Sequence, residues 1–255
     1  MSWCYAAASV IGLSHLRAGI RLQDAKRCFV VDSNGADAHR FFAIVSDGAG
    51  SAEFGGQGAS IVCRTFANLA AQEFRKNDGL PNDAIVWSWL DAARDRIQLA
   101  ATRRGRVARD FASTLVLVMI SADDLITAHV GDGAIVARNT LDRTWTVLSG
   151  PHNGEYASTT FFVTEDPQPA LRIARYQNQY DAVACFSDGI ENLVLDATTG
   201  TPSAAFFNPM ARPLEASLAH GEDASLSRSL ATFLGSGRVN ERTDDDKTLI
   251  VAVNK

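Results

Sequence analysis

Short apolar runs, separated by glycine, asparagine and aspartate, fill the first 45 residues of the chain. The runs at 10–13, 29–32 and 41–45 have the length and the turn-forming boundaries of β-strands, so they predict a strand meander. Ser33-Asn34-Gly35 stands between two of these runs. Asparagine and glycine readily adopt the backbone angles of tight turns, so this tripeptide predicts a hairpin.

Farther along, apolar residues recur at a spacing of three and four, which predicts a helix over 61–74 that ends near 77–79. A second helix is predicted over 85–100, with Asn82 or Asp83 as its N-cap. Its apolar residues follow one face and its charged residues the other, as in a helix packed on a core.

Strand-like runs return at 113–120, 125–130, 134–138 and 145–148, with turn residues between them, and they predict antiparallel neighbours. Residues 149–180 are irregular and rich in proline, which indicates a long surface excursion near a site. A buried strand is predicted over 180–186, helices over 202–219 and 222–234, and a closing strand over 248–253.

This order of elements predicts an α+β fold, with pairs of helices alternating with groups of strands along the chain. We expect a four-layer α-β-β-α sandwich, in which two antiparallel sheets pack face to face and a helix pair flanks each. A chain of 255 residues with 46% hydrophobic residues can bury a full core. Residues 1–255 are therefore predicted to form a single domain.

Composition narrows the function classes. The net charge of −5 argues against a nucleic-acid partner, because phosphate contacts need clustered lysine and arginine. The one basic cluster, between Arg103 and Arg109, is interpreted as a solvated helix end. The four cysteines are scattered and no apolar run reaches about 18 residues. We expect no signal peptide, no membrane span and a cytoplasmic location.

Aspartate recurs at the ends of apolar strand-like runs, and the residue after it is often glycine. One Asp-Gly pair is as typical of a plain turn as of a ligand, but the repetition favours a metal site. Clustered carboxylates repel one another unless cations join them, and oxygen donors favour Mg²⁺ or Mn²⁺ over zinc. The five histidines are interpreted as packing or surface residues rather than ligands, with His129, close to Asp132 in the sequence, kept as the one candidate for a role in the site. The units are Asp24, Asp47-Gly48, Asp132-Gly133, Asp188-Gly189 and Asp244-Asp245-Asp246.

In this order the units resemble the metal-dependent protein phosphatase family, the type 2C serine/threonine phosphatases, and the resemblance covers nearly the whole chain. Gly154-Glu155-Tyr156 is similar to a feature of a bacterial branch. The segments that carry the resemblance are Gly12-Leu13-Ser14-His15, Gln23-Asp24, Ser46-Asp47-Gly48-Ala49-Gly50-Ser51, Ala112-Ser113-Thr114-Leu115, His129-Val130-Gly131-Asp132-Gly133, Ser187-Asp188-Gly189 and Asp245-Asp246-Lys247-Thr248-Leu249.

The resemblance implies that Asp47, Asp188 and Asp245 are the catalytic aspartates that hold two Mn²⁺ or Mg²⁺ ions. Asp47 would bridge the ions and the Gly48 carbonyl would bind one of them. Asp24 would act from the outer shell, and Asp132 with Asp188 would hold a weaker third ion. The two ions would activate a water molecule for attack on phosphoserine or phosphothreonine.

The chain also departs from the family pattern. Gln23 stands where many members have a carboxylate. Ala49 stands where eukaryotic members often have a histidine proposed as proton donor, so protonation of the leaving group would fall to metal-bound water or another group. Gly19 replaces the family's phosphate-binding arginine. If this segment were an extended strand, Arg17 or Arg21 would share a face with Gln23 and could bind the substrate phosphate.

The leading hypothesis is therefore a metal-dependent protein phosphatase that acts on phosphoserine and phosphothreonine and is paired with a cognate serine/threonine kinase. The departures from the family pattern leave two alternatives open. One is a pseudophosphatase, which would bind a phosphoprotein without turnover. The other is a hydrolase of small phosphoesters.

Overall fold

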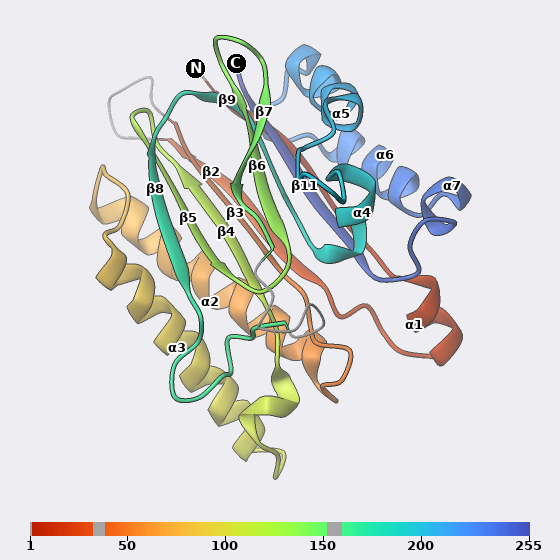
Figure 1. Cartoon of the computed structure of the whole chain (residues 1–255). Helices are drawn as coiled ribbons and strands as arrows, with labels where there is room; N and C mark the ends of the chain where they lie inside the picture. Colours follow the sequence, from red (N-terminus) through yellow and green to blue (C-terminus); the bar gives the residue numbers. More distant parts are fainter. Residues whose placement is uncertain (1, 33–38, 152–159) are drawn as a thin grey trace.

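The computed structural model describes residues 2–32, 39–151 and 160–255. Its centre is a pair of β-sheets packed face to face (Figure 1). One sheet has five strands in the order β2-β3-β4-β5-β8, and every pair in it is antiparallel. Its strands are β2 (Ala25–Asp32), β3 (His39–Ser46), β4 (Leu115–Ile120), β5 (Asp124–Val130) and β8 (Arg172–Gln177).

The other sheet has six strands in the order β10-β1-β11-β9-β6-β7. Its pairs are antiparallel, except that the two-residue β10 runs parallel to β1. The first and the last strand of the chain, β1 and β11, lie side by side in it (Figure 1). Its strands are β1 (Trp3–Val10), β6 (Ala134–Asn139), β7 (Trp145–Ser149), β9 (Tyr180–Phe186), β10 (Gly221–Glu222) and β11 (Lys247–Asn254).

Helices cover the outer face of each sheet (Figure 1). The five-stranded sheet is covered by α2 (Gly55–Lys76) and α3 (Asp83–Thr102), and the six-stranded sheet by α5 (Ala204–Ala216) and α6 (Ala224–Leu234). The predicted four-layer α-β-β-α sandwich is confirmed, with the parallel β10 as its one irregular edge. The short helices are α1 (Leu13–Ala18), α4 (Glu191–Val194), α7 (Gly237–Asn240) and the 3₁₀ turns η1 (Ala108–Phe111) and η2 (Asp188–Ile190).

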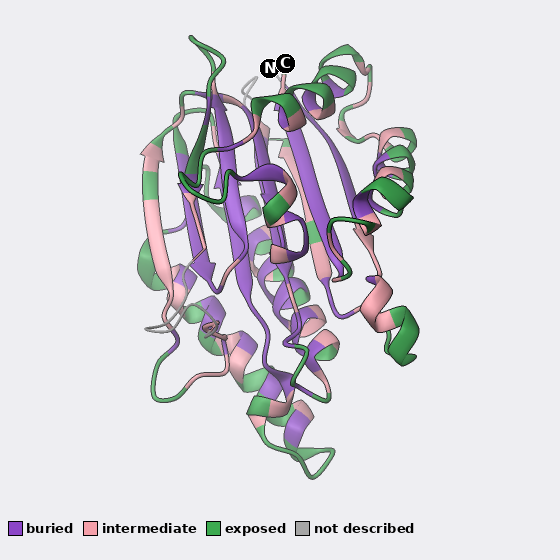
Figure 2. Cartoon of the chain, turned by 45° about the vertical axis from the view of Figure 1, so that its right-hand side comes forward, coloured by how far each residue is buried: buried purple, intermediate pink, exposed green. Residues whose placement is uncertain are grey.

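The core has three large parts, and the strands carry most of it (Figure 2). Between the sheets, Trp3 of β1 stacks on Phe41 of β3 with ring centroids 5.0 Å apart. The other two parts lie under the helix pairs, where α2 and α3 present buried faces to one sheet and α5 and α6 to the other. Apolar burial thus holds all four layers together.

Most of the predicted elements are present with slightly different ends. The helices predicted over 61–74 and 85–100 are α2 and α3, and the Asn82 side chain accepts the Ile85 N–H at 3.0 Å as the N-cap of α3. The predicted late helices are α5 and α6. β2 and β3 form the predicted hairpin pair, although its turn at 33–35 lies outside the described residues.

Three predictions of strand arrangement were wrong. Residues 10–13 do not form a strand, because β1 ends at Val10 and helix α1 begins at Leu13. β1 also lies in the other sheet from β2 and β3, so the first 45 residues are no meander. Finally, the strands over 113–148 are not all neighbours, since the chain crosses between the sheets after β5.

The irregular stretch 149–180 contains the strand β8, which the sequence analysis missed. β8 is an edge strand of mixed burial, paired only with β5, so it lacks the continuous apolar pattern of the central strands.

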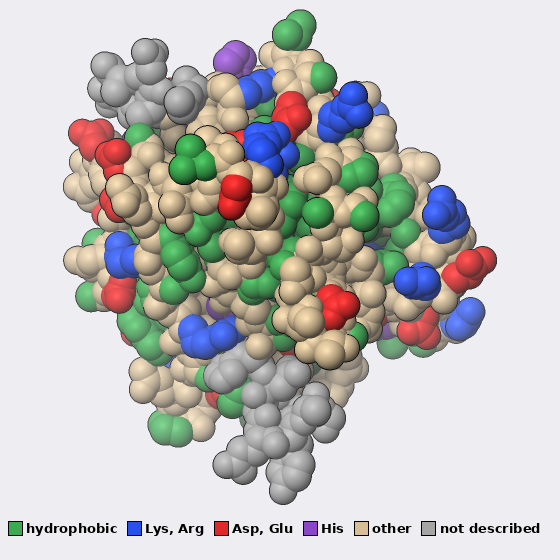
Figure 3. Space-filling view, turned by 45° about the horizontal axis from the view of Figure 1, so that its top comes forward, with side chains coloured by type: hydrophobic (Ala, Val, Ile, Leu, Met, Phe, Trp, Pro, Cys, Tyr) green, Lys and Arg blue, Asp and Glu red, His purple; other side chains and the backbone are tan. Residues whose placement is uncertain are grey.

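Over the described residues, no helix is long and apolar enough to cross a membrane. On the face that Figure 3 shows, basic and acidic side chains are interspersed rather than gathered by sign.

Candidate functional site

Both sheets end in aspartates at one end of the sandwich. Asp47 follows β3 of the five-stranded sheet, and Asp188 follows β9 of the six-stranded sheet. Asp132 lies in the crossover that joins β5 of one sheet to β6 of the other, and Asp245 stands just before β11. Packing the sheets face to face therefore brings together carboxylates that are far apart in the sequence.

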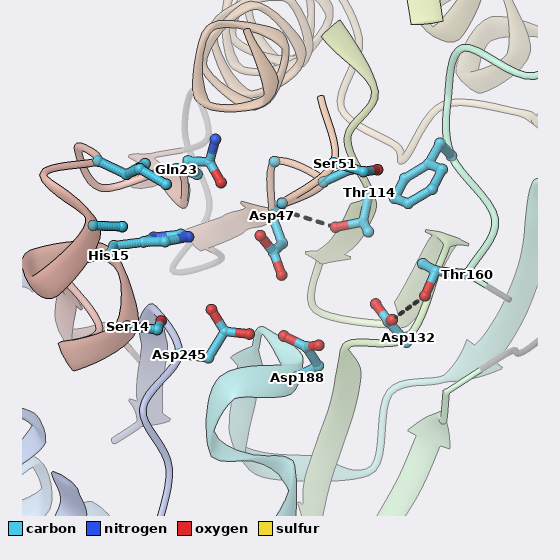
Figure 4. Close-up of a pocket in the computed structure, with 16 residues that line it drawn as sticks. Ser14, His15, Gln23, Asp47, Ser51, Thr114, Asp132, Thr160, Asp188 and Asp245 are labelled. Carbon is cyan, nitrogen blue, oxygen red and sulfur yellow. Dashed lines mark hydrogen bonds between the residues drawn. The ribbon is translucent and has the colours of Figure 1, made fainter. Parts of the chain in front are cut away.

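These carboxylates surround a cavity of about 400 Å³. In Figure 4, the side chains of Asp47, Asp188 and Asp245 point toward a common centre, with Asp132 to one side. The described residues that line the cavity are Ser14, His15, Ala18, Ile20, Gln23, Asp47, Gly48, Ala49, Gly50, Ser51, Thr114, Asp132, Thr160, Phe162, Asp188 and Asp245.

Asp47 is held by the start of β4. Its N–H donates to Thr114 Oγ1 at 2.9 Å, and its carbonyl accepts the Thr114 N–H at 2.8 Å. Ser46 Oγ donates to the Thr114 carbonyl at 2.6 Å. A side chain on Gly48 would collide with the backbone of Gly55 at 2.2 Å, which explains the glycine after Asp47. Thr114, singled out by its motif, therefore orients Asp47.

Asp188 and Asp245 come from segments in direct backbone contact. A Cβ on Gly189 would lie 1.8 Å from the Asp246 carbonyl oxygen, so only glycine permits this approach. Asp245 Oδ1 accepts the Asp246 N–H at 2.7 Å, which holds the Asp245 side chain in place. The close contact brings the Asp188 and Asp245 side chains to the same wall of the cavity (Figure 4).

Asp132 is tied to the residues after the irregular stretch, since Thr160 Oγ1 donates to Asp132 Oδ2 at 2.5 Å (Figure 4). Thr160 and Phe162 line the cavity, which agrees with the expectation that 149–180 runs near the site. No sequence signal distinguished these two residues. The motif Gly154-Glu155-Tyr156 lies outside the described residues.

Asp24 lies behind the cavity wall. Its side chain is buried, it does not line the cavity, and Ser187 Oγ donates to its Oδ2 at 2.8 Å. The adjacent Gln23 does line the cavity. Ser187 thus links Asp24 to the neighbouring Asp188, and the outer role of Asp24 stays a prediction.

The carboxylates disfavour one another's ionised form. The pKa of Asp47 is raised well above its usual value, first by burial and then by the charges of Asp24 and Asp188. The pKa of Asp188 is raised to about 7 by burial and by the charge of Asp132. Burial raises the pKa of Asp24 to about 6, against the hydrogen bond from Ser187. Such a group of carboxylates favours bound cations.

The residues present fit hard divalent cations. The donors are carboxylate oxygens and the Gly48 backbone, and Oδ1 of Asp188 is buried with no hydrogen-bond partner among the described residues. Among the described residues, no group of three His, Cys, Asp or Glu side chains lies close enough together to bind one metal ion directly. Mg²⁺ and ions like it retain several waters, so a wide ring of few direct ligands suits them.

The structure does not bring Arg17 or Arg21 to the cavity. Both residues are exposed, and Arg17 lies in helix α1, so the premise of an extended strand was wrong. Gly19 ends this helix with a left-handed φ of 68°, which explains the glycine in place of an arginine. Among the described lining residues there is neither arginine nor lysine.

His15 lines the cavity, although its isolated place in the sequence predicted a packing or surface residue. Asp246, placed in the site motif without a role of its own, is buried and accepts the backbone N–H groups of Gly12 and Gln23 at 2.7 and 2.6 Å. Asp246 therefore fixes the segment that carries His15. The motif Gly12-Leu13-Ser14-His15 was the sequence signal that could have pointed to His15.

Comparison with known proteins agrees with this geometry. Residues 11–235 match the family described as Protein phosphatase 2C. The chain belongs to this family. Over 255 residues, 99% of each chain, it is 33% identical to the Serine/threonine-protein phosphatase 3 of Escherichia coli (strain K12). The aspartates described above thus occupy the cavity of a protein phosphatase 2C fold.

Solved structures share the fold of this phosphatase 2C chain at low sequence identity. The serine/threonine phosphatase Stp1 from Staphylococcus aureus has a TM-score of 0.64 and 16% identity, over 98% of this chain and 94% of that chain. The catalytic domain of the serine/threonine protein phosphatase PstP, in complex with two manganese ions, has a TM-score of 0.61 and 17% identity, over 99% and 98%.

Proposed function

We propose that this chain hydrolyses phosphoserine and phosphothreonine in proteins, with two Mn²⁺ or Mg²⁺ ions as cofactors. The observation that carries the proposal is the convergence of Asp47, Asp188 and Asp245, from both sheets, on one cavity. The family match and the 33% identity to a bacterial serine/threonine phosphatase support it. So does the PstP domain, which was solved with two manganese ions.

In this proposal, Asp47 and the Gly48 carbonyl bind the ions from the five-stranded sheet, and Asp188 and Asp245 bind them from the six-stranded sheet. Asp132 with Asp188 forms a weaker third site, and Asp24 supports Asp188 from behind through Ser187. When bound, the ions supply Lewis-acid activation of a water molecule and neutralise the phosphate charge.

The chain's own residues have distinct parts in this reaction. Thr114 orients Asp47 by accepting and donating backbone hydrogen bonds, and Thr160 orients Asp132. The lining contains no arginine or lysine among the described residues, so the phosphate is bound without help from Arg17 or Arg21. The Ser51 hydroxyl, among the polar lining groups, remains as a donor to its oxygens.

The proposed substrate is a phosphoprotein, which is supported by the similarity to serine/threonine-protein phosphatases. A cognate serine/threonine kinase is the expected partner, since a phosphatase needs a source of phosphoprotein.

Cytoplasmic location is part of the same proposal, supported by the free cysteines Cys4, Cys28, Cys63 and Cys185. So is a single domain over 1–255, supported by the pairing of β1 with β11.

The test is phosphate release from a phosphoserine peptide by the purified protein in millimolar Mn²⁺. We expect turnover that a chelator abolishes, and a loss of about 10²-fold or more in Asp47→Asn, because the central ligand loses its charge. Asp78→Asn, in the exposed loop between α2 and α3, is the control and keeps wild-type activity. A wild type without turnover, or an Asp47→Asn variant as active as wild type, contradicts the proposal.

A pseudophosphatase is the second candidate, favoured by the lack of a basic side chain among the described lining residues. Calorimetry separates the two. Binding of two ions together with turnover supports the enzyme, whereas tight phosphopeptide binding without turnover supports the pseudophosphatase. Turnover of small phosphoesters with none of phosphopeptides would indicate a hydrolase of metabolites.

A further inference from the structure

An imidazole faces the proposed catalytic cavity. His15, in helix α1, is the single histidine among the described lining residues, and its side chain is 13% exposed. Figure 4 shows its ring pointing from the α1 side toward Asp47. The ring therefore faces the cavity in which we propose that the substrate binds.

A buried carboxylate holds this ring. His15 Nδ1 lies 3.0 Å from Asp246 Oδ2, and the Asp246 side chain is 1% exposed. The contact does not have the geometry of a hydrogen bond, and it becomes an ion pair when the imidazole carries a proton on both nitrogens. Because Nδ1 faces Asp246, Nε2 is the nitrogen left to meet a ligand in the cavity.

The helix that carries His15 is fixed to the same loop. Ser14 donates its N–H and its hydroxyl to the Asp244 carbonyl, at 2.9 and 2.7 Å. A Cβ on Gly12 would lie 2.3 Å from the Asp245 backbone, so this contact admits only glycine. The loop thus presents Asp245 to the cavity and Asp246 to the ring, which fixes the imidazole relative to a proposed metal ligand.

Hydrolysis of a phosphoserine requires a proton donor close to the serine oxygen that leaves phosphorus. The serine oxygen leaves as an alkoxide, a poor leaving group unless a proton reaches it during bond cleavage. The other lining groups supply none well, because the hydroxyls of Ser14, Ser51 and Thr160 are weak acids and the aspartates are assigned to the ions. Ala49, next to the Asp47-Gly48 turn, has only a methyl group.

We propose that His15 is the general acid that protonates the leaving serine or threonine oxygen, and that Asp246 is its positioning residue. The inference rests on the proposed phosphatase function. As water attacks phosphorus, the bond from phosphorus to the serine oxygen breaks, and its electron pair takes the Nε2 proton of the protonated imidazole, which leaves a neutral ring with its remaining proton on Nδ1, facing Asp246. The water's proton passes to solvent, and solvent reprotonates the imidazole. The net reaction is phosphoester plus water to alcohol plus phosphate.

The test compares leaving groups that differ in their need for a proton. We expect His15→Gln to lower kcat/KM for a phosphoserine peptide by about 10²- to 10³-fold, the usual contribution of general acid catalysis. The loss on p-nitrophenyl phosphate should be at least about tenfold smaller, because nitrophenolate leaves without a proton. In His15→Ala, added imidazole should restore part of the phosphopeptide activity.

Three controls make the result decisive. His39→Gln is the matched variant, because His39 also contacts an aspartate, Asp32 at 2.7 Å, but does not line the cavity. It should behave as wild type. Calorimetry should give the same Mn²⁺ stoichiometry for wild type and His15→Gln, and thermal melts should confirm that the variants fold.

Equal losses on the two substrates, an unaffected phosphopeptide activity, or no rescue by imidazole would each overturn the role of His15. A wild type that hydrolyses neither substrate would show a different failure. It would overturn the proposed function before any variant is measured. A variant with altered Mn²⁺ stoichiometry would also count against the proposal, because His15 would then act through the metal site.

Discussion

Asp188 combines the features that make this site depend on cations. It is mostly enclosed, it faces Asp132 and Asp47, and its pKa is raised to about 7. In the unfolded chain the same carboxyl ionises near pH 4. The folded protein without metal therefore holds this proton over a range of pH in which the unfolded chain releases it.

The sign of the stability effect follows from this difference. Because the folded state binds more protons between about pH 4 and 7, the free energy of unfolding of the metal-free protein falls as pH rises through that window. Relative to Asp188→Asn, the wild type should lose about 2–4 kcal/mol between pH 4 and pH 7.5. Urea unfolding with a chelator at the two pH values measures this.

The comparison includes its own controls. Asp78→Asn, in an exposed loop, should follow the wild-type pH dependence. Mn²⁺ should stabilise the wild type more at pH 7.5 than at pH 5, because ionised carboxylates bind it better. If the free energies of unfolding of the metal-free wild type and Asp188→Asn changed with pH in parallel, the buried Asp188 carboxyl would not lower stability as pH rises, which would contradict this account.

At the level of elements, the first turns of α2 support the Asp47 loop. A Cβ on Gly58 would lie 1.9 Å from the Phe111 carbonyl oxygen of η1, and Gly55 packs against Gly48. The rings of Phe54 and Phe111 stack at 5.0 Å between centroids. Close backbone contact, rather than hydrogen bonding alone, thus sets the distance from α2 to the site.

Gly58→Ala should lower the free energy of unfolding by about 2–4 kcal/mol, because the methyl group must push η1 away from α2. It should also weaken Mn²⁺ binding, since η1 leads into Thr114, just before β4, and Thr114 Oγ1 accepts the Asp47 N–H. Urea unfolding and calorimetry measure the two effects. Gly79→Ala is the control, with open space around its Cβ and a change of at most about 0.5 kcal/mol expected. Equal stability of the two variants would contradict this account.

Element type was predictable where the apolar pattern was long. The three-and-four spacing gave α2 and α3, and Asn82 gave the start of α3. Helix α1 has six residues and no fully buried side chain, so its pattern carries too little signal. That omission misplaced Arg17 and hid His15, because an extended segment and a helix turn different side chains toward the cavity.

At the level of the whole molecule, strand partners were the least predictable feature. β1 is fully buried along most of its length and pairs with β11, about 240 residues away, and nothing local encodes that choice. The chain changes sheets between β5 and β6, where Gly131 has a φ of 111°, an angle that glycine adopts readily. The sequence showed the glycine but not the change of sheet.

Convergence of the aspartates was predictable only through the repeated motif and the family it resembles. Spacing alone placed each carboxylate at a strand end but left open whether the ends meet. The face-to-face packing of the sheets decides this, because Asp47 belongs to one sheet and Asp188 to the other. The assignment of each residue to a particular ion stays a prediction.

The most direct measurement is an anomalous-scattering map from crystals grown with saturating Mn²⁺. We expect two strong peaks in the cavity between Asp47, Asp188 and Asp245, with occupancy lost in Asp47→Asn. A map with no peak in that cavity, or with manganese bound only elsewhere on the protein, would contradict the central claim that the two sheets assemble a metal centre.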